Sequence, residues 1–174
     1  IPAATQLFTP DWIVQYLVQN TVGHLWMQNH PDCRLAEDWE YYIPPSSNSA
    51  NDGNKDLFLS VDSPEELTVC DPACGSGHML TYAFDLLYSI YEDEGYSPRE
   101  IPGLILQHNL FGMEIDERAA NLAAFALTMK ARSRSRQFFR HQVMPHIQCI
   151  TPEYFTDEEV TELNELYDVT LDSG

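Results

Sequence analysis

The sequence predicts an α/β domain built on a parallel sheet, because short, apolar, β-prone segments alternate with longer segments of helical periodicity. The predicted strands cover residues 67–70, 109–114 and 146–150. A long helical pattern follows each of the first two strands. This alternation is typical of right-handed βαβ units, whose helices cover both faces of the sheet. The predicted fold class is therefore Rossmann-like α/β.

The first predicted strand, residues 67–70, is apolar and runs directly into Asp71. Apolar residues from Met79 onward recur at helical spacing, and the helix should end by Gly95. After the second strand, Asp116 is a candidate N-cap for the next helix. We expect the apolar face of that helix to include Leu122, Ala123, Ala126, Leu127 and Met129.

The N-terminal part of the chain, residues 1–31, predicts one helix that precedes the first strand. Thr9 is a candidate cap, and Pro10 suits the first helical position. Apolar residues continue at helical spacing to about residue 30, namely Ile13, Tyr16, Leu17 and Leu25. We expect residues 44–64 to form a polar loop and residues 67–174 to form the βαβ cofactor-binding core of the same single domain. Thr156 and Glu159 form a capping box for a final acidic helix.

Composition narrows the class of protein. The chain has 174 residues, 44% of them hydrophobic, which is enough for one folded domain. We expect no membrane segment, because no apolar run approaches the roughly 20 residues that a span needs. The four cysteines and six histidines form no common metal motif, so we expect free thiols, no metal and a cytoplasmic location. The chain begins with Ile1, which suggests a fragment or a processed product.

The net charge of −18 argues against direct binding of nucleic acid by this part of the protein. One stretch departs from the acidic average and contains Lys130, Arg132, Arg134, Arg136 and Arg140. These cations would favour the C-terminal end of a helix, and they could alternatively form an edge that faces phosphates.

Two acidic residues and two glycines predict a small-molecule pocket. Asp71 and Glu114 both follow predicted strands, and ligands of such sheets bind beyond the carboxyl ends of the strands. Gly75 and Gly77 would permit a tight turn between them. The turn does not match the dinucleotide pattern G-x-G-x-x-G, because Leu80 occupies the third glycine position.

S-adenosylmethionine suits this pocket better, because it has an ammonium group and a ribose but no pyrophosphate. Asp71 could attract the ammonium, and Glu114 could accept hydrogen bonds from both ribose hydroxyls. Ile115 could cover the adenine. Each feature alone is common, since most G-x-G segments are ordinary turns and most acids that follow strands are solvated. Their order and their place in the predicted fold favour the shared pocket.

The motifs themselves carry a resemblance. Residues 71–77, D-P-A-C-G-S-G, resemble the first motif of adenine-N6 DNA methyltransferases, and residues 112–116, G-M-E-I-D, resemble the second. Residues 6–10, Q-L-F-T-P, resemble the Thr-Pro motif that precedes motif one in some of these enzymes. Residues 5–17 are especially similar to the PglX-type methyltransferases of BREX phage-defence systems and their restriction-modification relatives.

The resemblance implies a partial S-adenosylmethionine-dependent methyltransferase fold and a set of cofactor contacts. The implied contacts are Thr9, Asp71, Ala73, Cys74, Gly75, Ser76, Gly77, Glu114 and Ile115. His78 could touch the carboxylate of the cofactor or simply pack at the start of its helix. Many relatives have an acid after the third strand, but residues 149–152 offer none, and Thr151 or a backbone group would have to replace it.

The catalytic motif of the family, Asn/Asp/Ser-Pro-Pro-Tyr/Phe, is absent from the sequence. The sole Pro-Pro pair, Pro44-Pro45, is followed by Ser46 and precedes motif one. We therefore predict no catalytic residue here and no activity for these residues alone. The complete enzyme would methylate adenine in DNA, through DNA contacts made elsewhere and possible contacts with other defence subunits. The alternatives are an acidic interaction module with an idle cofactor fold and a methyltransferase that acts on RNA or protein.

Overall fold

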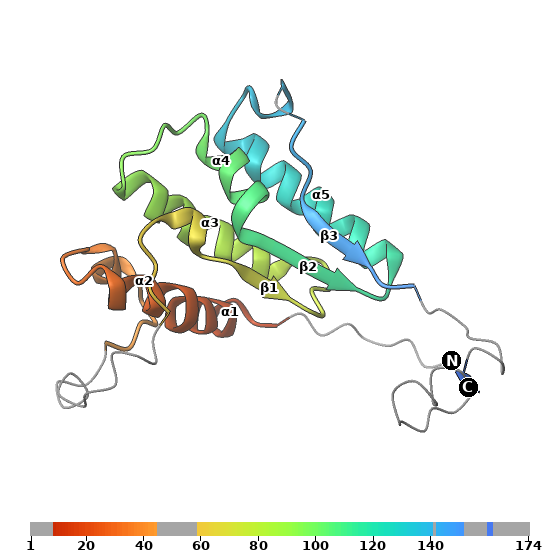
Figure 1. The fold of residues 1–174 in the computed structure, drawn as a ribbon, viewed down its shortest axis with the longest axis horizontal. Helices are drawn as coiled ribbons and strands as arrows, with labels where there is room; N and C mark the ends of the chain where they lie inside the picture. Colours follow the sequence, from red (N-terminus) through yellow and green to blue (C-terminus); the bar gives the residue numbers. More distant parts are fainter. Residues whose placement is uncertain (1–8, 45–58, 141, 152–159, 162–174) are drawn as a thin grey trace.

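A computed structural model describes residues 9–44, 59–140, 142–151 and 160–161. Its centre is a three-stranded parallel sheet in the order β1-β2-β3, with bounds Val69–Asp71, Leu110–Glu114 and His146–Cys149 (Figure 1). Helix α3 (His78–Asp93) connects the first two strands, and α5 (Glu117–Arg134) connects the last two. The three predicted strands and their parallel pairing are confirmed, although the first strand lies at residues 69–71 rather than 67–70. The fold is a partial Rossmann-like α/β fold.

Helices α3 and α5 pack on one face of the sheet. A Cβ atom built at Gly112 in β2 would lie 2.7 Å from Ile147 Cδ1, 2.9 Å from Leu80 Cδ1 and 3.0 Å from Cys74 Sγ, so glycine here leaves room for these side chains beneath α3. The opposite face bears Phe111 and Met113, which line an open hollow of about 730 Å³ together with residues of β3. Within the described part of the chain, the expected covering by helices is therefore found on one face only (Figure 1).

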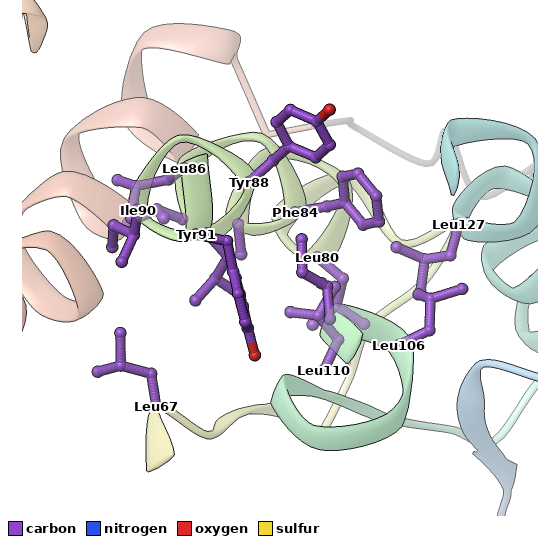
Figure 2. Packing of buried hydrophobic residues seen from close by; sticks show 14 of the residues in the cluster. Leu67, Leu80, Phe84, Leu86, Tyr88, Ile90, Tyr91, Leu106, Leu110 and Leu127 are labelled. Carbon is purple, nitrogen blue, oxygen red and sulfur yellow. The ribbon is translucent and has the colours of Figure 1, made fainter. Parts of the chain in front are cut away.

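The hydrophobic core surrounds α3, which packs against the sheet, against α5 and against the N-terminal helical residues (Figure 2). Its fully buried side chains include Leu80, Phe84, Leu87, Leu106, Leu110 and Leu127. A buried polar contact closes the end of the core near the start of β2. Asn109 accepts a hydrogen bond from the Tyr91 hydroxyl at 2.9 Å and donates to the carbonyls of Pro64 and Leu67, both at 2.7 Å. These bonds fix the segment that leads into β1, because an unpaired amide at this depth would be costly.

The N-terminal helical run consists of α1 (Asp11–Val18), a π-helical segment (Gln19–Gly23) and α2 (His24–Asn29). The predicted helix is confirmed, but two details are wrong. Pro10 occupies the N-cap position without a side-chain cap, so Thr9 is not the cap. The buried face uses Val14 and Val18, whereas Tyr16 and Leu17 are each 40% exposed. The residues that face the core are set by the position of α3, which the local pattern cannot show.

A short helix α4 (Ile101–Leu104) and a π-helical segment (Ile105–Asn109) lead into β2. Short 3-10 turns cover Leu35–Asp38, Pro64–Glu66 and Phe138–Arg140. The predicted apolar face of α5 is partly wrong, because Leu122 and Met129 are 51% and 46% exposed. The buried face consists instead of Ala120, Ala123, Leu127 and Ala131. Small residues there let α5 approach the rest of the domain closely.

Two further predictions concern the ends of the domain. Asp116 caps α5 as predicted, since its Oδ1 accepts from the backbone N–H groups of Arg118 at 2.8 Å and Ala119 at 3.3 Å. The capping box at Thr156 and Glu159 lies outside the described residues. Among the residues that the structure describes, no helix is long and apolar enough to cross a membrane.

Candidate functional site

The ends of β1 and β2 meet at one place, as the sequence predicts. The turn after β1 folds onto the end of β2, where Cys74 N–H donates to the carbonyl of Met113 at 2.9 Å. Next to it, Gly75 N–H donates to Glu114 Oε2 at 2.7 Å. This second bond joins residues 39 positions apart in the sequence. It therefore links the glycine turn directly to the acid at the end of the neighbouring strand.

Backbone N–H groups surround the Glu114 carboxylate. Its Oε1 accepts from Ile115 N–H at 2.8 Å and from Asp116 N–H at 3.1 Å. The donors of Asp116 and Gly75, followed by that of Ile115, hold the pKa of Glu114 below its ordinary value, so the group is ionised near neutral pH. Each carboxylate oxygen has a second lone pair and can accept another hydrogen bond. Glu114 is thus a fixed, charged acceptor.

The two glycines of the turn have different roles. Both have positive φ, +53° at Gly75 and +81° at Gly77, a conformation that favours glycine. A Cβ atom at Gly75 would meet nothing within 4 Å, so this residue borders open space. A Cβ atom at Gly77 would lie 3.0 Å from Ala123 Cβ in α5. Gly75 leaves room outside the turn, whereas Gly77 permits close packing inside the domain.

Asp71 is bound much more loosely than Glu114. Its Oδ1 accepts one hydrogen bond, from Ala73 N–H at 3.2 Å, which is a local turn contact. The side chain is half-buried, while Ala73 is exposed. Ser76 is also half-buried, and Ile115 presents an apolar side chain that is 79% exposed. Asp71 therefore keeps most of its acceptor capacity for another partner.

Cys74 lies beneath the turn and is only 6% exposed. Burial, followed by the negative charges of Asp71 and Glu114, raises the pKa of its thiol to about 11. A nucleophilic cysteine needs the opposite, a lowered pKa and access to solvent. Cys74 is a packing residue of the turn rather than a nucleophile, and its implied contact with the cofactor remains a prediction.

The start of α1 reaches the glycine turn through a contact that the sequence did not predict. His78 Nε2, in the first residue of α3, lies 2.9 Å from Asp11 Oδ1, in the first residue of α1. The sequence placed Asp11 directly after the Thr-Pro pair, at the start of a predicted helix, but gave no sign of a partner for it. Thr9, two residues earlier, is exposed, and its predicted contact with a cofactor remains a prediction.

The end of β3 adds backbone atoms near Glu114. Ile150 N–H donates to the carbonyl of Glu114 at 2.8 Å, which extends the pairing of β2 and β3 by one residue. Thr151 is exposed, and the proposed replacement of the missing acid stays a prediction. No group of three or more potential metal-ligating side chains occurs within the described ranges.

The cations near the end of α5 are engaged in contacts within the domain. Lys130 and Arg134 both pair with Asp85 of α3, the latter at 3.1 Å. Arg134 also lies over the Tyr88 ring, 4.6 Å from its centroid. Arg132 similarly lies 5.9 Å from the centroid of the Phe139 ring. These contacts favour a structural role for these three cations over a phosphate-facing edge.

The chain is similar to known proteins over most of its length. The family model of the MmeI DNA-methyltransferase domain matches residues 35–150, which is more than half of the chain. The chain belongs to this family. The match includes both acids, both glycines and the whole sheet of this methyltransferase domain.

Two curated relatives are adenine-specific methyltransferases. BrxX from Escherichia coli O9:H4 (strain HS) is 48% identical over 167 residues, which are 94% of this chain and 14% of BrxX. PglX from Lacticaseibacillus casei (strain Zhang) is 44% identical over 156 residues, which are 84% of this chain and 13% of PglX. The resemblance to PglX-type methyltransferases is confirmed. The chain spans about a seventh of the length of these relatives.

A solved structure of a nuclease-deletion mutant of the Type ISP restriction-modification enzyme LlaGI, in complex with a DNA substrate mimic, is also similar. The alignment has a TM-score of 0.47 and 15% identity, and it covers 94% of this chain and 11% of LlaGI.

Proposed function

We propose that residues 1–174 are the S-adenosylmethionine-binding portion of a DNA adenine-N6 methyltransferase from a phage-defence or restriction-modification system. Membership of the methyltransferase-domain family and the two adenine-specific relatives support the reaction class. One structural observation carries the assignment of the site. The hydrogen bond from Gly75 N–H to Glu114 Oε2 joins the two cofactor motifs into a single site at the strand ends.

The residues of the site fit this cofactor. The carboxylate of Glu114 is oriented by three backbone donors and can accept from a pair of vicinal hydroxyls. Gly75 borders open space, so a ligand can approach the backbone without meeting a side chain. Asp71 offers a second, less engaged carboxylate at the adjacent strand end. Two separated carboxylates and a bare turn match a ligand that has a ribose and an ammonium group.

The side chains of this chain bind and orient the cofactor. When bound, S-adenosylmethionine supplies a methyl group on a positively charged sulfur. Glu114 would hold the ribose hydroxyls, and Asp71 would attract the ammonium group directly or through water. Ile115, which is largely exposed, would cover one face of the adenine. Holding the donor at both ends fixes its orientation, which is how positioning contributes to methyl transfer.

The group that would hold the target base is not among these residues. The family motif is absent from the sequence, and its sole Pro-Pro pair precedes the glycine turn. In the proposed complete enzyme, other parts would extrude adenine from the duplex and contact DNA. We therefore expect residues 1–174 to bind the cofactor without methylating DNA. A cytoplasmic location and association with other defence subunits belong to the same proposal.

Calorimetric titration of the protein with S-adenosylmethionine tests the assignment. Glu114→Ala should weaken binding by roughly 10- to 100-fold, because charge-assisted hydrogen bonds are worth about 1.5–3 kcal/mol. Glu117→Gln is a matched control, since it removes a negative charge from an exposed residue three positions away. It should leave the affinity within about twofold of the original. Equal affinities for the Glu114→Ala variant and the unmodified protein would contradict the placement of the ribose.

The charge of −18 favours a second candidate, an acidic interaction module that keeps the fold but no longer supports turnover. Such a surface repels nucleic acid and suits a basic protein partner. The titration identifies an idle site that has lost its cofactor affinity, because such a site would give no heat of binding, whereas an idle site that still binds would be identified by the absence of methyl transfer in the complete protein. A methyltransferase that acts on RNA or protein would bind the cofactor equally well. Radiolabelled methyl transfer by the complete enzyme to DNA, RNA or protein would identify the acceptor.

A further inference from the structure

A side-chain contact joins the N-terminal ends of two helices beside the proposed cofactor site. Asp11 is the first residue of α1, and His78 is the first residue of α3. Asp11 Oδ1 lies 2.9 Å from His78 Nε2. A carboxylate oxygen accepts, so His78 donates through Nε2–H in this contact. The contact spans 67 positions and brings the Thr9-Pro10 segment close to the glycine turn.

The His78 end of this contact is rigid. His78 follows Gly77 directly, and the packing of Gly77 against Ala123 fixes the turn in place. The His78 Nδ1 atom is buried and has no hydrogen-bond partner among the described residues. The imidazole ring therefore has Nδ1 inward and Nε2 toward Asp11. It presents a donor to α1 from a well-packed turn.

The Asp11 end, in contrast, has little other support. The Asp11 side chain is 82% exposed, and Thr9 and Pro10 are also exposed. The anchors of α1 in the core are Val14 and Val18, which lie one and two turns further along. The contact with His78 thus restrains the first turn of α1, which has no buried side chain at Thr9, Pro10 or Asp11 to anchor it in the core.

We infer that His78 is a positioning residue, which holds the Thr9-Pro10-Asp11 start of α1 beside the glycine turn so that both can contact the cofactor together. The inference rests on the proposed function. Direct contact of His78 with the cofactor fits less well, because Nε2 is engaged by Asp11 and Nδ1 is buried. Reaching a ligand through Nε2 would require the pair to open.

A double-mutant cycle measured by calorimetric titration with S-adenosylmethionine tests this role. His78→Ala and Asp11→Asn should each weaken binding of S-adenosylmethionine by roughly three- to tenfold. The affinity of the double variant should be no lower than that of whichever single variant binds more weakly. His78→Gln should restore most of the affinity, because its amide can place a donor near the position of Nε2. Additive losses would mean that the two residues act separately and would overturn the inference.

Asp85→Asn is the matched control on the same helix. It disrupts the pairing with Lys130 and Arg134 between α3 and α5, away from the turn. It should lower the melting temperature and leave the cofactor affinity within about twofold of the original. A loss of affinity in this variant as large as that in His78→Ala would show that any weakening of α3 has the same effect, and would overturn the specific role of His78.

Hydrogen exchange supplies a measurement that does not depend on the ligand. The amides of Ile13 and Val14 donate to the carbonyl of Pro10 at 2.9 and 3.2 Å in the first turn of α1. Their exchange should accelerate by roughly three- to tenfold in His78→Ala but not in Asp85→Asn. Unchanged exchange would overturn the inference whether or not the cofactor binds. Accelerated exchange without any cofactor binding by the unmodified protein would instead count against the proposed function alone.

Discussion

The ends of β1 and β2 each carry a carboxylate, but the two carboxylates differ in how many hydrogen bonds restrain them. At the end of β2, the Glu114 carboxylate accepts three backbone hydrogen bonds, one of them from the turn that follows β1. At the end of β1, Asp71 accepts one bond, from Ala73 two residues away. Glu114 therefore stabilises the connection between two strands and is available to a ligand as well. Asp71 stabilises only its own turn and is free for a partner of opposite charge.

This difference shows that a binding acid can also be part of the fold. The hydrogen bond from Gly75 N–H restrains the orientation of the Glu114 carboxylate, so little conformational freedom would remain to be lost when a ligand binds. Asp71 lacks this restraint and can adjust to its partner. We expect mutations at the two ends to separate accordingly, with effects on folding concentrated at the turn and at Glu114.

The largest effect on stability should come from substituting the glycines of the turn between β1 and α3, which contacts the end of β2. Gly77→Ala imposes a left-handed conformation on a residue with a side chain, at about 1–2 kcal/mol, and forces its methyl against Ala123, at about 1–3 kcal/mol. Gly75→Ala imposes the first cost without the second, because its methyl would meet nothing within 4 Å. Urea unfolding should therefore give a loss of about 2–5 kcal/mol for Gly77→Ala and about 1–2 kcal/mol for Gly75→Ala.

The two glycine variants should also differ in binding. The methyl of Gly75→Ala points into the open space where we place the ligand, so cofactor affinity should fall although most of the stability remains. Equal losses of stability for the two variants would contradict the inner and outer roles assigned to Gly77 and Gly75.

A smaller effect should distinguish the two acids directly. Glu114→Gln loses the charge that three N–H groups surround, and we expect the melting temperature at pH 7 to fall by roughly 2–5 °C. Asp71→Asn keeps an oxygen that can accept from Ala73 N–H, so its melting temperature should change by less than about 1 °C. Thermal unfolding followed by circular dichroism would measure both. A larger loss in Asp71→Asn would reverse the comparison.

The contribution of Glu114 should also depend on pH in a defined direction. Its pKa is lower in the folded protein than the value of about 4.3 typical of an unfolded chain. The stabilisation is therefore fully present above this unfolded value, and it disappears as the pH falls through the lower, folded pKa. The melting temperatures of Glu114→Gln and the unmodified protein should converge on acidification below about pH 4. A difference that stays constant at low pH would show that the charge is not responsible.

The sequence predicted those parts of the fold whose causes are local. The helical periodicity after Gly77 and the acid that caps α5 each depend on neighbouring residues, and both were confirmed. The two glycines with positive φ were likewise expected from their place between a strand and a helix.

Other features depend on contacts between distant segments and could not be predicted. The buried face of α1 is set by how this helix meets α3, so Val14 and Val18 are inside rather than Tyr16 and Leu17. The sequence placed Gly75 and Glu114 at one site but could not show that they bond to each other. The pairing of Asp11 with His78 had no local signal at all.

The smallest expected effect uses Cys74 as a reporter of the two acids. Burial is the main reason that the pKa of its thiol is raised to about 11, and the charge of Asp71 contributes more than that of Glu114. Removing a negative charge should therefore increase the thiolate fraction of Cys74 at pH 9, by roughly twofold in Asp71→Asn and by less in Glu114→Gln. Site-resolved mass spectrometry of iodoacetamide labelling would measure the rates, with exposed Cys70 as the accessible reference thiol. If Glu114→Gln accelerated labelling of Cys74 more than Asp71→Asn did, the added rate would come from opening of the turn. The hydrogen bond between Gly75 and Glu114 would then affect the labelling rate of Cys74, through its accessibility to solvent, more than the charges of the two acids do.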